Sequence, residues 1–278
     1  MAELGKFNQL KILRKVDFGL YLDGGQYGDI LLPKRYVKEG MEPDDEIEVF
    51  VYLDGEERTI ATTDKPLAQV GEFAFLKVSS VERAGAFLEW GIMKDILVPF
   101  SEQRVKMEAG RSYVVYLYVD KLTDRISATM KLEKYLDKSP ADYSINEEVD
   151  ILIWSATDIG YKAVINNSHS GVLYKSDIFK PLRTGQKMKA YIKKIRDDGK
   201  IDLVPDKPGY QKVGGIAEVI LGKLNDHGGK LPFNDKSSPE MIYSTFGVSK
   251  KVFKQALGQL YKLKIIQITD EGIELVVL

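Results

Sequence analysis

The 278-residue sequence predicts a mainly β, multidomain protein, in which three tandem five-stranded barrels of the OB-fold type precede an α+β winged-helix domain. One motif occurs three times, and self-similarity at a regular spacing indicates repeated copies of one folding unit. Within each copy, short apolar runs rich in β-branched and aromatic residues indicate strands. After Gly214 and Gly215 the apolar residues recur at helical spacing instead, which indicates a different final domain.

Each copy of the motif begins at a glycine, at Gly19, Gly85 and Gly160. Because the spacings between these glycines are 66 and 75 residues, the repeated unit has the size of a small domain rather than of a solenoid turn. An apolar run follows at 29–33, 95–99 and 171–174, then a second glycine (Gly40, Gly110, Gly185), and the copies close at 58–62, 125–129 and 199–203. The expected barrels cover residues 5–66, 70–136 and 147–206.

The first copy shows the expected strands in order. Residues 10–16 and 20–23 alternate around Gly19, which permits a sharp bend or bulge. A short buried strand at 30–32 stops at Pro33, a long strand covers 46–52, and a last one covers 59–62. Residues 130–136 look like one or two helical turns, and 137–146 form a linker.

The last domain, expected at 216–278, contains three helices and a hairpin. Apolar residues at helical spacing end before Gly228, Ser238 can cap a helix that begins at Pro239, and Ser249 can cap the next. That last helix turns one side inward: Val252, Phe253, Ala256, Leu257, Leu260 and Tyr261. With strands at 265–269 and 273–278, these elements describe a winged helix.

These motifs are similar to those of a known family. The order of glycine with aromatics, Asp-Ile-Leu, glycine, valine-rich strand and Arg-Ile-Ser resembles the S1 RNA-binding domain of ribosomal protein S1. Three S1-type units with a C-terminal winged helix resemble the bacterial conserved virulence factor B (YitL-like) family. The resemblance implies a cytoplasmic bacterial protein that binds RNA and affects gene expression after transcription.

S1 barrels stack bases on two aromatics near the first glycine and carry a histidine on the next strand. At these three places the first copy has Phe18, Tyr21 and Leu32, the second has Ala84, Phe87 and Val98, and the third has Ile159, Lys162 and Tyr174. No copy carries the full set. The loss of RNA binding in one or two copies, which would then act as spacers, is therefore an open alternative.

The charge of the chain is uneven, although its net charge is only −1. Residues 1–66 carry −5, residues 67–146 carry 0, residues 147–215 carry +3 and residues 216–278 carry +1. A polyanion is therefore expected to prefer the C-terminal half. The chain has no cysteine, no signal-like start and no apolar run near the roughly 20 residues of a membrane helix, which fits a cytoplasmic protein with no membrane partner.

The third copy best meets the needs of single-strand binding, which are aromatic surface for bases and cations for phosphates. Strand alternation places Lys189, Tyr191 and Lys193 on one outer face, with Ala190 and Ile192 inward. The predicted RNA-binding residues are Lys162, Tyr174, Lys175, Lys189, Tyr191, Lys193, Lys194 and Arg196. Secondary candidates are Phe18, Tyr21, Phe87, Lys250, Lys251 and Lys254. Solvated lysines on an ordinary strand would give the same pattern.

The corresponding residues of the first copy are Glu48, Phe50 and Tyr52. The acid is unfavourable for phosphate, so these aromatics are expected to serve packing or a contact between repeats.

The sequence contains no pattern typical of an enzyme. His169 and His227 lack partner ligands and are expected on the surface or in turns, and the acidic pairs 44–45 and 197–198 fall in turns. No catalytic residue, metal or cofactor is expected. The predicted function is non-catalytic binding of single-stranded RNA with low sequence preference. The alternative is a DNA-binding or protein-docking scaffold that acts through the winged helix, with the barrels as spacers.

Overall fold

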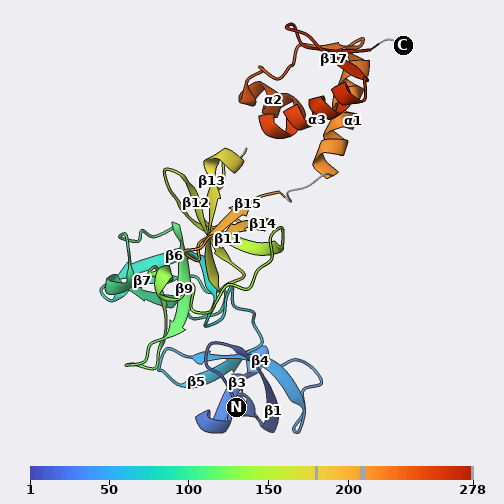
Figure 1. Cartoon of the computed structure of the whole chain (residues 1–278). Helices are drawn as coiled ribbons and strands as arrows, with labels where there is room; N and C mark the ends of the chain where they lie inside the picture. The colour runs from blue at the N-terminus through green and yellow to red at the C-terminus, as the bar shows by residue number, and fades with distance from the viewer. Residues whose placement is uncertain (179–180, 207–210, 277–278) are drawn as a thin grey trace. The chain divides into compact units, whose positions relative to one another are not determined.

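The computed structural model describes residues 1–178, 181–206 and 211–276, and these form three closed five-stranded barrels and a small helical domain (Figure 1). The mainly β fold class expected from the sequence is confirmed. Within the described part of the chain, no helix is both long and apolar enough to cross a membrane.

The first barrel contains β1 (Phe7–Val16), β2 (Gly19–Asp23), β3 (Asp29–Pro33), β4 (Glu46–Leu53) and β5 (Thr59–Thr62). The strands close in the order β1-β2-β3-β5-β4, where only the β3–β5 contact is parallel. Its core includes the fully buried side chains of Ile12, Leu20, Leu22, Ile30 and Leu32. The alternating residues that indicated these strands in the sequence are thus the ones that fill the barrel.

The second and third barrels repeat this topology. The second contains β6 (Phe73–Glu82), β7 (Gly85–Leu88), β8 (Ile96–Pro99), β9 (Ser112–Val119) and β10 (Ile126–Thr129). The third contains β11 (Glu148–Ala156), β12 (Gly160–Ile165), β13 (His169–Tyr174), β14 (Lys187–Ile195) and β15 (Ile201–Val204). Short 3-10 turns follow several strands, among them η4 (Leu132–Lys134) in the helical segment expected near 130–136 and η5 (Lys175–Asp177) after β13.

The first glycine of the motif is needed where two strands cross closely. Gly19 has a φ of +154°, and a Cβ added to it would lie 2.1 Å from the carbonyl oxygen of Leu32. Gly85 has a φ of +152°, with the carbonyl oxygen of Val98 at 2.2 Å from such a Cβ. Only glycine fits this approach of two backbones, which explains why the motif repeats a glycine here.

The first and second barrels are joined by an aromatic contact. Phe50 on β4 is fully buried and packs edge-on against Trp90, with ring centroids 5.4 Å apart. The Trp90 indole N–H donates to the carbonyl of Ala68 at 2.6 Å. Phe50 and Tyr52 belong to one buried cluster with residues of the second barrel, so the expected contact between repeats is confirmed.

Backbone groups at the start of β1 also bind the segment leading into the second barrel. The N–H of Phe7 donates to Oε1 of Gln69 at 2.9 Å, and the carbonyl of Gly5 accepts from the N–H of Val70 at 2.9 Å.

The second barrel contacts the turn between β12 and β13 through the backbone groups that correspond to the Phe7 N–H and the Gly5 carbonyl. The N–H of Phe73 donates to Oδ1 of Asn167, and the Asn167 amide donates to the carbonyl of Gly71, both at 2.8 Å. Backbone pairing makes Phe73 the counterpart of Phe7, and Gly71 the counterpart of Gly5. In both barrels, therefore, the same N–H and the same carbonyl at the start of the first strand bind the segment that follows in the contact.

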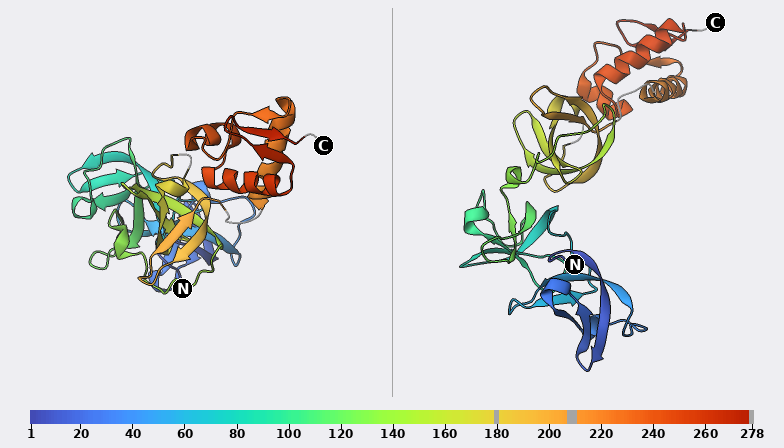
Figure 2. Two further views of the ribbon diagram at one scale, coloured as in Figure 1. Left: turned by 45° about the horizontal axis from the view of Figure 1, so that its top comes forward. Right: turned by 60° about the horizontal axis from the view of Figure 1, so that its bottom comes forward.

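The C-terminal domain contains α1 (Gln211–Asp226), β16 (Lys230–Leu231), α2 (Pro239–Phe246), α3 (Lys250–Lys262), β17 (Ile266–Ile268) and β18 (Ile273–Leu275) (Figures 1 and 2). Ser238 Oγ accepts from the N–H of Met241 and Ser249 Oγ from that of Val252, so both expected caps are present. Gly247 ends α2 in the left-handed conformation, at φ +70°. The winged helix is confirmed.

Three details of this domain differ from expectation. The first helix begins at Gln211 rather than 216 and continues through Gly215, although a helical glycine costs roughly 1 kcal/mol. Tyr261 was expected on the inner side of α3 but is 57% exposed, because Leu257 and Leu260 already fill that side. Strand β16 was not anticipated. Residues 277–278 of the expected last strand, and 179–180 of the third barrel, lie outside the described residues.

Candidate nucleic-acid interface

The predicted alternation of β14 is present in the third barrel. Ala190 and Ile192 are fully buried, Lys189 and Lys193 are exposed, and Tyr191 is half-buried. The register of β14 against β15 shifts between Ile192 and Lys194, so Lys193 lies at an irregularity of the strand.

Carboxylates accompany the residues of this face. The Lys189 ammonium lies 2.9 Å from Asp150, and the Tyr191 hydroxyl donates to Glu148 at 2.7 Å. The bond to this carboxylate raises the pKa of Tyr191, because the neutral phenol is the donor. Lys193 pairs instead with Asp177, which follows β13, at 2.7 Å.

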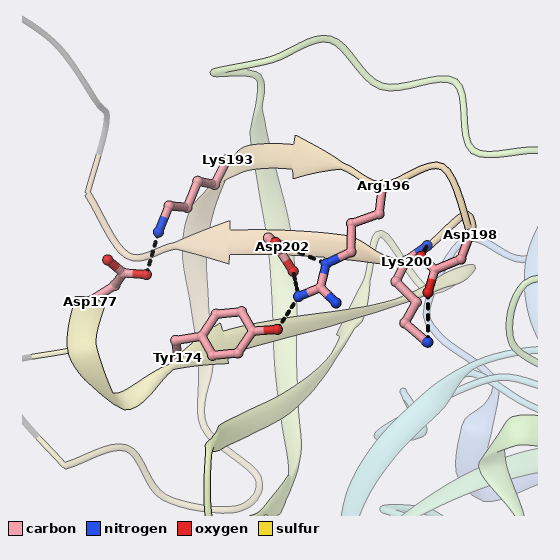
Figure 3. Close-up of polar contacts among 7 residues, drawn as sticks. All are labelled: Tyr174, Asp177, Lys193, Arg196, Asp198, Lys200 and Asp202. Atoms are coloured by element: carbon pink, nitrogen blue, oxygen red, sulfur yellow. Dashed lines mark hydrogen bonds and ion pairs between the residues drawn. The ribbon is translucent and has the colours of Figure 1, made fainter.

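Arg196, at the end of β14, brings Tyr174 into the same neighbourhood (Figure 3). Its guanidinium lies between Asp202, 2.8 Å away on β15, and the hydroxyl of Tyr174, to which it donates. The bond to Asp202 raises the pKa of Arg196. Figure 3 also shows Lys193 pointing toward Asp177, and Lys200 toward Asp198 at 2.7 Å. The structure therefore assembles Tyr174, Lys193 and Arg196 as a mixed-charge surface, where the sequence indicated a basic one.

The remaining predicted cations lie apart from these pairs. Lys175 in η5 and Lys194 on β14 are exposed and form no ion pair within the described residues. Lys162 lies on β12, opposite Ser155 of β11, with its ammonium 5.1 Å from the centre of the Trp154 ring.

The face of Tyr191 has counterparts in the first two barrels. One backbone hydrogen bond occurs at the same place in each barrel. Its N–H donor and carbonyl acceptor are Val51 and Lys6 in the first, Leu117 and Glu72 in the second, and Ile192 and Glu147 in the third. Tyr191 and Glu148 therefore correspond to Phe50 and Phe7, whose rings lie 5.5 Å apart, and to Tyr116 and Phe73, whose rings lie 4.7 Å apart. The first two pairs belong to clusters that include residues of the following barrel. In the third barrel a polar pair replaces the two aromatic ones.

The secondary candidates of the first barrel form an aromatic surface. Phe18 is 56% exposed, and its ring meets that of Tyr21 edge-on with centroids 6.2 Å apart. The guanidinium of Arg14 lies 4.3 Å from the centre of the Tyr21 ring and pairs with Asp29 at 2.5 Å. Two aromatics and a cation are thus adjacent on one outer surface.

The corresponding surface of the second barrel contains fewer aromatic side chains. Phe87 is half-buried on β7, and Ala84 is exposed at the place of Phe18. The Ser79 hydroxyl donates to Asp95 at 2.5 Å, and its oxygen lies 3.0 Å from the carbonyl oxygen of Phe87. Ser80 pairs with Phe87 as Arg14 pairs with Tyr21, so a serine stands where the first barrel has Arg14.

The three lysines of the winged helix lie on α3. Lys250 is half-buried, whereas Lys251 and Lys254 are exposed. Lys254 pairs with Asp235 at 3.5 Å.

The two histidines lie in different domains and differ in exposure. His227 is exposed, as expected, and its Nδ1 lies 2.9 Å from the carbonyl of Lys223. His169 was expected on the surface or in a turn but is 6% exposed at the start of β13, with Nε2 2.9 Å from the carbonyl of Ser139. The expected exposure was wrong, and the ring nitrogen contacts Ser139 of the linker. Within the described ranges, no cluster of three or more potential metal ligands occurs.

Three residues beside the candidates were missed by sequence reasoning. Arg14 and Trp154 lie at bulges in β1 and β11, where the register shifts between Ile12 and Arg14 and between Ile153 and Ser155. Arg104 comes from the second barrel, with its guanidinium 5.9 Å from the centre of the Trp154 ring. The bulges could have been inferred by aligning the three copies, but the contact of Arg104 could not.

Comparison with known proteins agrees with this architecture. Residues 4–64 and 70–131 match a model of the S1 domain, and residues 218–275 match a model of the CvfB-like winged helix domain. The Bacillus subtilis protein YitL is 29% identical over 91% of this chain and 87% of its own length. Conserved virulence factor B of Staphylococcus aureus is 28% identical over 84% of this chain and 83% of its own.

One solved structure also covers nearly the whole chain. It is a multidomain protein with nucleic acid binding domains from Streptococcus pneumoniae, 26% identical over 98% of each chain, with a TM-score of 0.42.

Proposed function

Because the chain belongs to the conserved virulence factor B (YitL-like) family, which joins S1 domains to a winged helix, we propose that it binds single-stranded RNA in the cytoplasm with little sequence preference. It acts on gene expression after transcription as a binding protein and catalyses no reaction. Its working parts are the barrels at 5–66, 70–136 and 147–206 and the winged helix at 216–278.

The observation that supports this proposal best is the Phe18, Tyr21 and Arg14 surface of the first barrel. A ring that is 56% exposed offers a face to a base at no cost in core packing. Every base has a π-face, so stacking tolerates any sequence and contributes about 1–3 kcal/mol per base. Arg14, held over Tyr21, is placed to meet the phosphate beside a stacked base.

The third barrel supplies cations to the same activity. Its proposed contacts are Lys162, Tyr174, Lys175, Lys189, Tyr191, Lys193, Lys194 and Arg196. An exposed ion pair contributes only about 0–1 kcal/mol, so RNA phosphates can compete for Lys189 and Lys193. The carboxylates stay in place, however, and weaken the net attraction. Lys175 and Lys194 are thus proposed to contribute more per residue than the paired lysines.

The experiment compares labelled single-stranded RNA, single-stranded DNA and duplex DNA as ligands of the full chain at two salt concentrations. The proposal expects single-stranded RNA to bind most tightly, with an affinity that falls as salt rises. A preference for duplex DNA would favour the winged helix as the binding domain. Absence of salt-sensitive binding to all three ligands would favour a docking scaffold and overturn the proposal.

A further inference from the structure

Trp154 lies at the bulge of β11, where the pairing with β12 shifts between Ile153 and Ser155. Its ring is half-buried and packs against a cluster that contains Phe73 and Leu132 of the second barrel and Leu152 of the third. The indole ring is therefore fixed at the place where the second and third barrels meet, with part of its surface open to solvent.

Two cations converge on this ring from different barrels. The Lys162 ammonium lies 5.1 Å and the Arg104 guanidinium 5.9 Å from its centre. Arg104 pairs with Glu133, whereas exposed Lys162 has no carboxylate partner among the residues described. Both cations lie beside one ring, but only Arg104 has a paired carboxylate. The positive charge of Lys162 is therefore left without a paired negative charge among the described residues.

Half-buried tyrosines continue the aromatic surface on the second barrel. The rings of Tyr135 and Tyr116 stack with centroids 4.0 Å apart, and Tyr118 lies 5.8 Å from Tyr135. Tyr135 and Tyr116 pack against the same cluster as Trp154. Aromatic rings beside cations, one of them without a carboxylate partner in the described residues, are features that single-stranded nucleic acid requires.

We propose that Arg104, Lys162 and Trp154 form a backbone-binding site for single-stranded RNA at the junction of the second and third barrels. The two cations contact phosphates, and Trp154 positions both of them. This inference rests on the proposed function and adds a site to it. A purely structural role explains less, because cation–ring contacts at exposed sites contribute only about 0.5–1 kcal/mol and do not require a second cation of the same sign.

The test uses the full chain and a fluorescein-labelled oligouridylate of about 12 nucleotides, within the roughly 4–16 nucleotides that one OB barrel covers. Each lost phosphate contact flattens the slope of log affinity against log salt by about 0.7 for a single strand. The double variant R104A/K162A is therefore expected to bind more weakly and to lose about 1.4 from the slope.

The matched control is R111A/K121A, with both residues on the second barrel. Arg111 is also exposed and paired with a glutamate, Glu108, and Lys121 is exposed like Lys162. This control is expected to keep the slope of the unmodified chain. If R104A/K162A does not fold, Lys162→Ala alone carries the test, with an expected loss of about 0.7.

A second readout uses the two tryptophans. Trp90 is only 2% exposed, so iodide quenching reports mainly on Trp154. Bound oligouridylate is expected to exclude iodide and to reduce the quenching. Unchanged quenching, or an unchanged slope in R104A/K162A while the unmodified chain binds RNA, would overturn this site and leave the proposed function intact. If the unmodified chain shows no salt-dependent binding, the proposed function fails together with the site.

Discussion

The side chain of Asn167 accepts a hydrogen bond from the backbone N–H of Phe73, at 2.8 Å, across the boundary between the third and second barrels. The same amide donates to the carbonyl of Gly71. One side chain thus satisfies two backbone groups that strand pairing within the second barrel leaves available. The bond to Phe73 is part-buried and the bond to Gly71 is exposed, so the Phe73 N–H depends more on this amide than the Gly71 carbonyl, which water can reach.

Asn167→Gly tests that contact. Asn167 has a φ of +57°, which glycine adopts without strain, so the variant removes only the amide. We expect the free energy of unfolding to fall by about 1 kcal/mol, measured by urea denaturation, because the part-buried Phe73 N–H loses its partner while water can reach the Gly71 carbonyl. Asn146→Gly is the control, at φ +67° on an exposed side chain, and should change stability little. Equal stability of the two variants would contradict the role of Asn167.

Phe18→Ala tests the stacking surface of the first barrel. Because the ring is 56% exposed, stability should change little, while RNA affinity should fall by about 1–3 kcal/mol. The salt slope should stay the same, since no cation is lost. Phe100→Ala removes a ring that is 48% exposed on the second barrel and serves as the control. Equal losses of affinity in both variants would argue against a specific platform at Phe18.

The carboxylates of the third barrel offer a test with the opposite sign. Neutralising the partners of Lys189 and Lys193 in D150N/D177N removes two negative charges beside the proposed phosphate contacts. RNA affinity at low salt should therefore rise severalfold, and K189A/K193A should lower it and flatten the slope. Asp158→Asn, an exposed acid of the same barrel, should have a smaller effect. A fall in affinity on neutralisation would show that the lysines need their partners for orientation.

Alkaline pH should destabilise the barrels through their tyrosines. Burial raises the pKa of Tyr52 and of Tyr118 to about 12 in the folded chain, against about 10 when unfolded. The neutral form is favoured by folding, so this stability is present below pH 10 and is lost as pH rises from 10 toward 12. Urea midpoints measured from pH 9 to 11 should fall above pH 10. Tyr118→Phe should show a shallower fall, and an identical profile would contradict this cause.

The elements of the fold were largely predictable because they depend on local pattern. Period-two apolar runs gave the strands, and Ser238, Pro239 and Ser249 marked the helix starts that the structure contains. The glycines at 19 and 85 were recognised as bends, although the close carbonyls that require them come from another strand.

The candidate interface was less predictable because its charges depend on register and on contacts between barrels. Asp150 is 39 positions from Lys189 in the sequence, and it reaches that lysine only when β11 and β14 lie in the same barrel. Arg104 and Trp154 meet only because two barrels pack together. Counting charges along the chain detected the lysines of the third copy but not the acids that the fold places beside them.

Phe7 and Phe73 make their contacts with the next segment through backbone N–H groups. Gly5 and Gly71 make theirs through backbone carbonyls. Such groups persist under almost any substitution in the barrel that provides them. Side chains on the outer surface of each copy are then free to diverge during evolution without dismantling the connection to the next. The chain can thus carry aromatic surface on one barrel and charged surface on another, because mutation of one repeat need not be matched by mutation of its neighbour.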